Sequence, residues 1–148
     1  MIVAILLAAG KSSRTGNKYK LLLPYKNKTI IAHSINNLLN SDIDRIIIVV
    51  GKAQHQIKKH IITNKKIKIY YNKSYPSGMA SSIKIGMKYL PKKTKSFFIT
   101  LADMPNIQPM YYNAMINIGK KIVTFLLFLI FKKNKLILFC FLIVLKKN

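Results

Sequence analysis

Three continuous apolar runs and one shorter, alternating run constrain the fold of this chain more than any other feature. An uninterrupted apolar run of this length predicts a strand that is buried on both faces, as in a parallel sheet. The segments between the runs carry apolar residues at helical spacing. The predicted strands are Met1–Leu7, Arg45–Val50, Ile67–Tyr71 and Ser96–Leu101. One predicted helix begins at Thr29, and three others span Gln54–Ile62, Met79–Leu90 and Met110–Ile118.

The order of these elements predicts the fold class. Strands alternate with helices in units of about thirty residues, which indicates βαβ crossovers and an α/β, Rossmann-like, mostly parallel sheet with flanking helices. Ligands of such sheets bind outside the carboxyl ends of the strands. Two segments fall there, the loop Ala8–Lys20 after the first strand and Ala102–Pro105 after the fourth. We therefore expect the functional residues in these two segments.

The first of these loops has the composition of a phosphate-binding loop. Its small residues let backbone N–H groups approach a phosphate closely. Arg14, Lys18 and Lys20 supply positive charge that neutralises a triphosphate. The alternative is an ordinary basic loop between a strand and a helix, and the loop alone does not separate the two interpretations.

The second segment contains one of only three acidic residues in the chain. Asp42 and Asp44 flank a single Ile just before a predicted strand, and they are interpreted as a turn or a cap. Asp103 follows a buried strand, where a carboxylate can hold Mg²⁺ against phosphate oxygens. The alternative is a capping Asp in a turn that contains Pro105.

A third polar segment, Asn72–Ser82, precedes and opens a predicted helix. A Gly-containing polar turn of this kind can hydrogen-bond the base or ribose of a nucleotide. A helix cap explains the same residues, and the turn alone favours that explanation.

The composition sets further bounds. The 26 basic residues and 3 acidic residues give a net charge of +23, which is typical of proteins that bind polyanions. The basic residues are nearly all Lys and are dispersed along the chain, so codon drift in an AT-rich gene is the favoured interpretation. Cys140 is the only cysteine, which excludes an intramolecular disulfide and a cysteine zinc site. Without a secretory signal, the sequence predicts a cytoplasmic protein.

Taken together, four segments resemble the MobA-like nucleotidyltransferases, and within them the molybdenum cofactor cytidylyltransferases. That family has the pattern L-A-A-G-x-S-x-R-x-G, then K-L-L-x-P, then G-M-x-x-S, then G-D-x-P. The four segments occur here in the same order over residues 1–105, with Ala102 in place of the Gly that precedes the family's Asp. They are Leu7–Gly16, Lys20–Pro24, Gly78–Ser82 and Leu101–Pro105.

The resemblance implies a role for each matching residue. It implies a nucleotide-diphospho-sugar transferase type of fold and transfer of CMP from CTP to a molybdopterin-type acceptor, with Mg²⁺ as cofactor. Arg14, Lys20 and Asp103 would be catalytic, with Asp103 also the metal ligand. The preference for CTP over GTP rests on Ala9, where guanylyl members more often have Gly. The residues that would bind the nucleotide are Leu7, Ala8, Ala9, Gly10, Arg14, Lys20, Asn72, Gly78, Ser81 and Ser82.

The chain changes character after Val123. Residues 124–148 comprise 17 apolar residues, 5 Lys, 2 Asn and 1 Thr, without Gly, Pro or acid. The resemblance implies a G-N-P-type loop and a second acidic segment after this point, and neither is present. We therefore predict that residues 1–123 are the N-terminal part of the transferase domain. Residues 124–148 are predicted to be an anomalous tail, read out of frame, and the chain to be inactive or severely impaired.

Two other interpretations of the tail stay open. A membrane anchor over Phe125–Leu145 would place three lysines near its middle, at a cost of about 8–10 kcal/mol against a gain of about 5–8 kcal/mol, so insertion is not favoured. A β-hairpin with Lys132–Lys135 as its turn could complete the sheet.

Two other functions also stay open for the whole chain. The first is a MobA-like transferase that uses GTP or a sugar-phosphate acceptor. The second is a basic protein that binds polyanions or membrane surfaces. Aromatic residues are not interleaved with the basic ones on any predicted element, so no nucleic-acid partner is expected.

Overall fold

The structure is a computed structural model that describes residues 1–10, 19–121, 126–128 and 141–144. From residue 121 onward only the backbone is described.

A six-stranded sheet with the order β5-β4-β1-β6-β8-β7 forms the centre of the fold. The first four strands in this order are parallel, and β8 and β7 are antiparallel to their neighbours. The predicted mostly parallel sheet is thus confirmed, with every predicted strand within one residue of its observed bounds. The strands are β1 (Ile2–Ala8), β4 (Arg45–Val50), β5 (Ile67–Tyr71), β6 (Ser96–Leu101), β7 (Leu126–Phe128) and β8 (Phe141–Val144).

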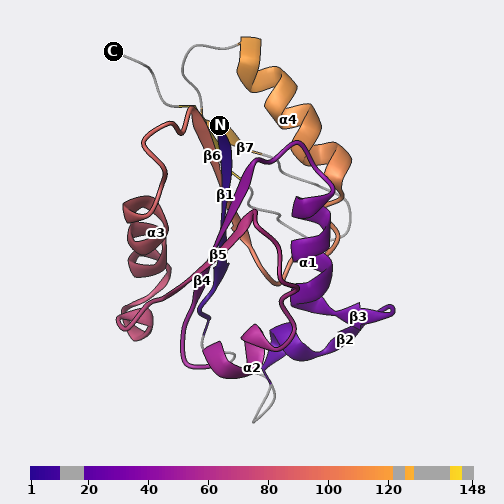
Figure 1. Cartoon of the computed structure of the whole chain (residues 1–148), viewed down its shortest axis with the longest axis vertical. Helices are drawn as coiled ribbons and strands as arrows, with labels where there is room; N and C mark the ends of the chain where they lie inside the picture. Colours follow the sequence, from indigo (N-terminus) through magenta and orange to yellow (C-terminus); the bar gives the residue numbers. More distant parts are fainter. Residues whose placement is uncertain (11–18, 122–125, 129–140, 145–148) are drawn as a thin grey trace.

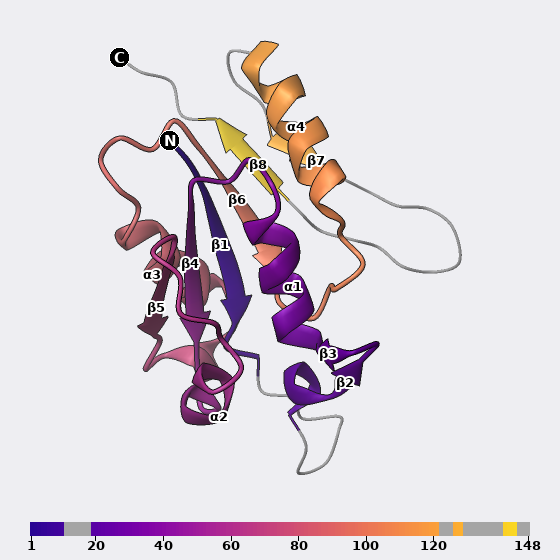
Figure 2. The same ribbon diagram turned by 45° about the vertical axis from the view of Figure 1, so that its right-hand side comes forward.

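Helices cover both faces of this sheet, with α1 and α4 on one face and α3 on the other (Figure 1). The short helix α2 and the two-stranded sheet of β2 and β3 lie at the end where the parallel strands finish (Figure 2). The elements are η1 (Lys20–Leu22), β2 (Pro24–Tyr25), β3 (Lys28–Thr29), α1 (Ile30–Leu39), α2 (Gln54–Lys58), η2 (Tyr75–Ser77), α3 (Met79–Lys88) and α4 (Pro109–Lys121).

Two predicted helices end earlier than the sequence pattern suggested: α3 ends at Lys88 rather than Leu90, and α2 departs further from its prediction. The prediction extended it to Ile62, but α2 ends at Lys58. Within α2 only Ile57 is buried, and Ile62 is 57% exposed. A helix gains most of its stability from packing of an apolar face, so one buried residue supports only a short helix.

Alternate residues of each central strand face two separate cores. On β1, Val3, Ile5 and Leu7 face α3, while Ala4 and Leu6 face α1 and α4. All five are 8% exposed or less, which explains why this strand is apolar without alternation.

The two described segments of the tail are strands on either side of the turn that the hairpin interpretation expected. β7 pairs with β8, and β8 pairs with β6. The expected turn at Lys132–Lys135 lies outside the described residues. Among the described helices, none is long and apolar enough to cross a bilayer.

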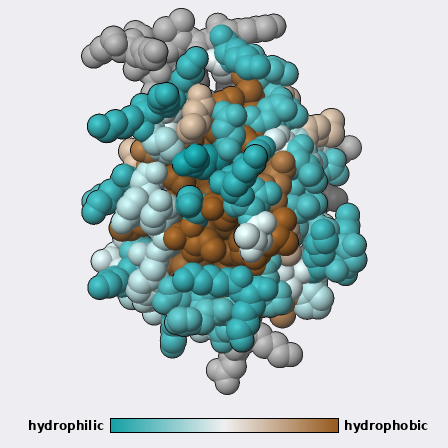
Figure 3. Space-filling model, viewed as in Figure 1, coloured by the Kyte–Doolittle hydropathy of each residue, from teal (hydrophilic) through white to brown (hydrophobic). Residues whose placement is uncertain are grey.

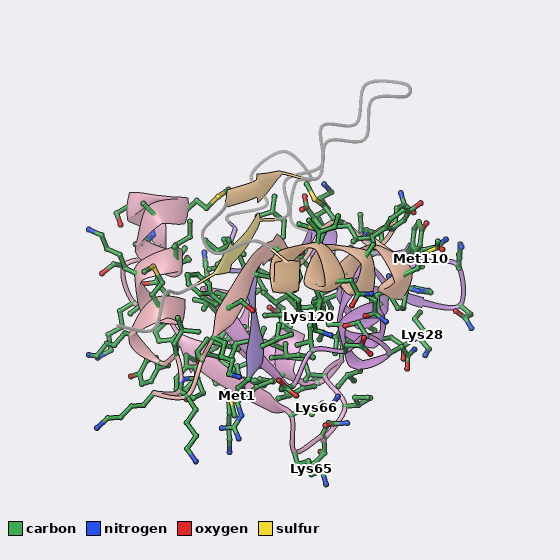
Figure 4. The ribbon with its side chains drawn as sticks, turned by 90° about the horizontal axis from the view of Figure 1, so that it is seen from above. Met1, Lys28, Lys65, Lys66, Met110 and Lys120 are labelled. Atoms are coloured by element: carbon green, nitrogen blue, oxygen red, sulfur yellow. The ribbon has the colours of Figure 1, made fainter. Side chains whose placement is uncertain are left out.

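Charged side chains are spread over the surface rather than gathered. Figure 4 shows Lys28 and Lys65 at well-separated places on the periphery. Figure 3 shows an apolar area in the middle of the face seen in Figure 1, surrounded by hydrophilic residues. Strand β5 forms one edge of the sheet among the described strands, and its second residue, Lys68, is exposed. A charged residue on an edge strand discourages pairing with other chains.

Two polar contacts fix the ends of this framework. Asp44 accepts a hydrogen bond from the backbone N of Ile2 at 2.6 Å, which joins the start of β1 to the residue before β4. Thr29 caps α1, since its hydroxyl accepts a hydrogen bond from the backbone N of Ala32.

Helix α3 can approach β1 closely because residue 86 is a glycine. A Cβ atom at Gly86 would lie 2.3 Å from Cγ2 of Ile5, which is completely buried. The packing of the helix on the sheet therefore depends on the missing side chain.

We predict that Gly86→Ala destabilises the protein although alanine favours helices. Overpacking costs about 1–3 kcal/mol, and the clash with Ile5 puts this variant at the upper end. The gain in helix propensity is about 1 kcal/mol, which leaves a net loss. Urea unfolding monitored by circular dichroism measures the change. Gly10→Ala is the control, because a Cβ atom there would meet nothing within 4 Å. A Gly86→Ala variant as stable as the parent chain would contradict the packing.

Candidate functional site

A pocket of about 500 Å³ lies at the carboxyl ends of β1 and β6. After β1 the chain continues to β4, which pairs with one side of β1, whereas β6 pairs with the other side of β1. The pocket therefore lies at the topological switch point, where open α/β sheets bind their ligands. Its walls are Leu7, Ala9, Gly10, Lys20, Leu21, Tyr75, Pro76, Gly78, Met79, Ser82, Leu101 and Asp103.

The polar end of the pocket is an ion pair between two predicted catalytic residues. Nζ of Lys20, in η1, lies 2.7 Å from Oδ2 of Asp103, in the loop after β6. The two side chains are 49% and 35% exposed. A pair as accessible as this one contributes little to stability.

Asn72 holds the opposite wall of the pocket without lining it. The residue is only 1% exposed. Its Nδ2 donates hydrogen bonds to the hydroxyls of Ser81 at 2.8 Å and Ser82 at 3.0 Å, and its Oδ1 accepts one from the backbone N of Ser74 at 2.9 Å. Because both N–H donors of the amide are used within the protein, this side chain fixes the turn before α3.

Two glycines shape the same wall for different reasons. Gly78 precedes α3 with φ of 106°, a conformation that other residues rarely adopt. Gly51 follows β4 at a point of close approach, since a Cβ atom there would lie 2.9 Å from both the carbonyl oxygen of Ala9 and Cγ of Tyr75. The aromatic ring can therefore pack against the end of the sheet only while residue 51 has no side chain.

Most of the predicted site residues come together in this one pocket. Those that line it are Leu7, Ala9, Gly10, Lys20, Gly78, Ser82 and Asp103. Ala8, Asn72 and Ser81 do not line it, and Arg14 lies outside the described residues. Ala8 is buried in the core beneath α1, as the alternation of side chains along β1 requires.

Beyond Leu7 and Ala9, the apolar part of the lining was not named among the predicted site residues. It consists of Leu21, Tyr75, Pro76, Met79 and Leu101. Each of these residues lies within or next to a segment that was singled out for its polar or small residues. Their proximity to those segments was the only available signal, because an apolar residue at such a position is indistinguishable from a core residue.

The carboxylate of Asp103 fits one kind of metal site. In the described part of the chain no three His, Cys, Asp or Glu residues gather around a common point. Mg²⁺ commonly uses one or two carboxylates and completes its shell with substrate phosphates and water. The pocket therefore fits a Mg²⁺ ion that binds together with a nucleotide, and does not fit a closed metal site made by the protein alone.

The sequence profile of the MobA-like NTP transferase domain matches residues 4–124. The chain belongs to the MobA-like NTP transferase family. The four motifs that suggested the resemblance all lie within the matched residues.

Two relatives show how much of a family member this chain covers. The molybdenum cofactor cytidylyltransferase of Escherichia coli K12 is 34% identical over 106 residues, which are 72% of this chain and 53% of the relative. The bifunctional protein GlmU of Staphylococcus epidermidis is 29% identical over 105 residues, 70% of this chain and 23% of the relative. The chain thus spans about half or less of the length of these curated relatives.

Solved structures share the fold at lower identity. Rv0371c from Mycobacterium tuberculosis superimposes with a TM-score of 0.71 and 22% identity, over 82% of this chain and 62% of that one. The 4-diphosphocytidyl-2C-methyl-D-erythritol synthase of Anaerococcus prevotii gives a TM-score of 0.73 at 18% identity, over 97% of this chain and 70% of that one. These matches confirm the nucleotidyltransferase fold.

We predict that Asn72→Ala destabilises the protein by about 1–3 kcal/mol, because it removes the hydrogen bonds of Asn72 with the buried hydroxyl of Ser82, with the half-buried hydroxyl of Ser81 and with the backbone N–H of Ser74. Chemical unfolding measures the loss. Asn64→Ala is the matched control, since Oδ1 of Asn64 also accepts a hydrogen bond from the N–H two residues later, at 2.9 Å. Equal losses in the two variants would contradict the importance of the contacts with Ser81 and Ser82.

Proposed function

We propose that the pocket binds a nucleoside triphosphate with Mg²⁺ and transfers the nucleoside monophosphate to a phosphorylated acceptor, releasing pyrophosphate. The observation that carries this proposal is the pairing of Lys20 with Asp103 at the switch point of the sheet. One cation and one carboxylate at this place match the two charged components of a metal–triphosphate complex.

The two charged residues have separate roles in this proposal. Lys20 binds phosphate oxygens and stabilises the negative charge that builds up on the leaving pyrophosphate. Asp103 holds Mg²⁺, which screens the phosphates and withdraws charge from the phosphorus under attack when it is bound. A solved structure of Rv0371c is described as a complex with manganese, which supports a divalent ion for the fold.

The rest of the pocket suits the nucleoside. The wall opposite the ion pair is apolar and aromatic, formed by Tyr75, Pro76 and Met79, and Gly78 and Ser82 add polar groups. A nucleotide with a charged end and a heterocyclic end therefore has a matching surface at each end. Catalysis would consist mainly of positioning the acceptor phosphate in line with the leaving group.

We propose CTP as the nucleotide and a molybdopterin-type cofactor as the acceptor. The support is the 34% identity with the Escherichia coli cytidylyltransferase and the presence of Ala9 in the pocket wall. GTP or a sugar-phosphate acceptor is the alternative within the same family. A cytoplasmic location remains part of this proposal.

We predict that Asp103→Asn abolishes the Mg²⁺-dependent part of CTP binding, and that Lys20→Met weakens binding of the nucleotide itself. A lost charge-assisted contact of about 1.5–3 kcal/mol corresponds to a 10- to 150-fold change in affinity. Isothermal titration of CTP and GTP, with and without Mg²⁺, measures both effects. The controls are Asp42→Asn and Lys28→Met, since neither residue lines the pocket. If these controls lose as much affinity as the pocket variants, the site is wrong. Tighter binding of GTP would favour the alternative nucleotide.

We also propose that residues 124–148 are read out of frame and that this chain binds nucleotide without efficient transfer. The family match ends at residue 124, within one residue of the change in composition. We expect resequencing across the codons for residues 119–127 to reveal another frame that encodes a Gly-Asn-Pro loop and an acidic segment. If no frame encodes them, the tail is genuine. Pyrophosphate release from CTP and the pterin at normal rates would contradict the predicted loss of activity.

A further inference from the structure

The loop that carries Asp103 is tied to helix α1 by two hydrogen bonds one helical turn apart. Oγ of Ser34 donates to the carbonyl oxygen of Ala102 at 2.8 Å, in a buried contact. Nδ2 of Asn37 donates to the carbonyl oxygen of Pro105 at 2.9 Å. The two acceptors lie on either side of Asp103, so α1 holds the backbone both before and after the carboxylate. We call residues 102–108, between β6 and α4, the Asp103 loop.

Further contacts fix the same loop on its other sides. The backbone N of Ala102 donates to the carbonyl oxygen of Leu7 at 3.1 Å, which continues the pairing of β6 with β1. The hydroxyl of Tyr25 donates to Oδ1 of Asn106. The backbone of Ala102 is thus held through its N–H by β1 and through its carbonyl oxygen by α1. Figure 2 shows the loop running beside α1 on its way to α4.

Ser34 donates its single hydroxyl proton to this loop. Its Oγ also lies 3.2 Å from the carbonyl oxygen of Ile30 within the helix, but the shorter contact is to Ala102. Ser34 is 5% exposed and Ala102 is 1% exposed. Water therefore cannot replace the hydroxyl without movement of the loop, and its removal leaves a buried carbonyl group without a donor.

We infer that Ser34 and Asn37 are positioning residues that set where the Asp103 carboxylate stands for the metal–nucleotide complex. The inference rests on the proposed role of Asp103 as a Mg²⁺ ligand. Neither residue lines the pocket, so both act through the loop. Mg²⁺ demands near-ideal octahedral geometry, which makes its affinity sensitive to the placement of a ligand. Outer-shell partners of metal ligands typically change metal affinity by 10- to 100-fold when they are removed.

The chain offers a matched control for Ser34. Ser41 is 6% exposed, and its hydroxyl donates to the carbonyl oxygen of Leu38 at 2.7 Å. Ser34→Ala and Ser41→Ala therefore remove the same group at the same burial. The two variants differ in whether the lost hydrogen bond leads to the Asp103 loop. A purely structural role predicts equal effects of the two changes.

The test is a titration of the full chain with Mn²⁺ at saturating CTP, in which electron paramagnetic resonance measures the concentration of the free ion. We expect Ser34→Ala to raise the Kd for Mn²⁺ about tenfold and to leave the affinity for CTP without metal within about twofold. Ser41→Ala should leave both values unchanged. Equal Mn²⁺ affinities in the two serine variants would overturn the inference.

Asn37→Leu is a second variant that preserves approximate size and removes the donor, and we expect it also to weaken Mn²⁺ binding. Its control is Asn36→Leu on the same helix, since the side chain of Asn36 makes no hydrogen bond in the described part of the chain. An effect in both asparagine variants, or in neither, would count against the role of Asn37.

A measurement without ligands tests the loop itself. The amides of Ala102 and Ile107 donate to the carbonyl oxygens of Leu7 and Met104. We expect Ser34→Ala to accelerate hydrogen exchange at these two amides more than Ser41→Ala does, and unchanged exchange would overturn the inference. If the parent chain binds neither CTP nor Mn²⁺, the proposed function fails. If it binds both and loses Mn²⁺ only in Asp103→Asn, the positioning role alone fails.

Discussion

The parallel pairing of β1 with β4 on one side and β6 on the other is the constraint on which the site depends. The register aligns Leu7 with Val49 and with Leu101. Ala9, Gly51 and Asp103 follow the ends of these three strands, so the chain leaves the sheet at the same end in all three places. The carbonyl oxygen of Ala9 lies 2.9 Å from the position that a Cβ atom of residue 51 would take. A slip of one residue in either pairing would turn every side chain of a strand to the opposite face and remove this alignment.

Burial of β1 on both faces explains what could be predicted from the sequence and what could not. Its apolar residues identify it as a central strand, and Arg45–Val50 and Ser96–Leu101 followed from the same reasoning. The sequence pattern could not reveal the contact between Lys20 and Asp103, which are 83 residues apart. It also could not show that the amide of Asn72 donates hydrogen bonds to two serines. A polar residue before a helix has the same sequence pattern whether its side chain binds a ligand or its own chain. Asn72 as a ligand contact stays a prediction.

The two glycines and Asn72 show how the wall opposite the ion pair is organised. The absence of a side chain at Gly51 admits the ring of Tyr75, while the positive φ of Gly78 turns the chain into α3. Asn72 then joins the residues on either side of that turn. The wall is therefore set by backbone conformation and by hydrogen bonds between uncharged groups, rather than by charged side chains.

The charged end of the pocket is organised in the opposite way. An isolated buried carboxylate would cost several kcal/mol, whereas the partly exposed pair of Lys20 and Asp103 neutralises itself at little cost. A metal–triphosphate complex can replace both partners at once, with phosphate oxygens at Lys20 and the metal ion at Asp103, so no charge is left unpaired. Once the complex has replaced the ion pair, Lys20 no longer holds the carboxylate of Asp103 in place. If the carboxylate is to keep its position while its charged partner changes, uncharged contacts must fix it, and the hydrogen bonds from Ser34 and Asn37 are of this kind.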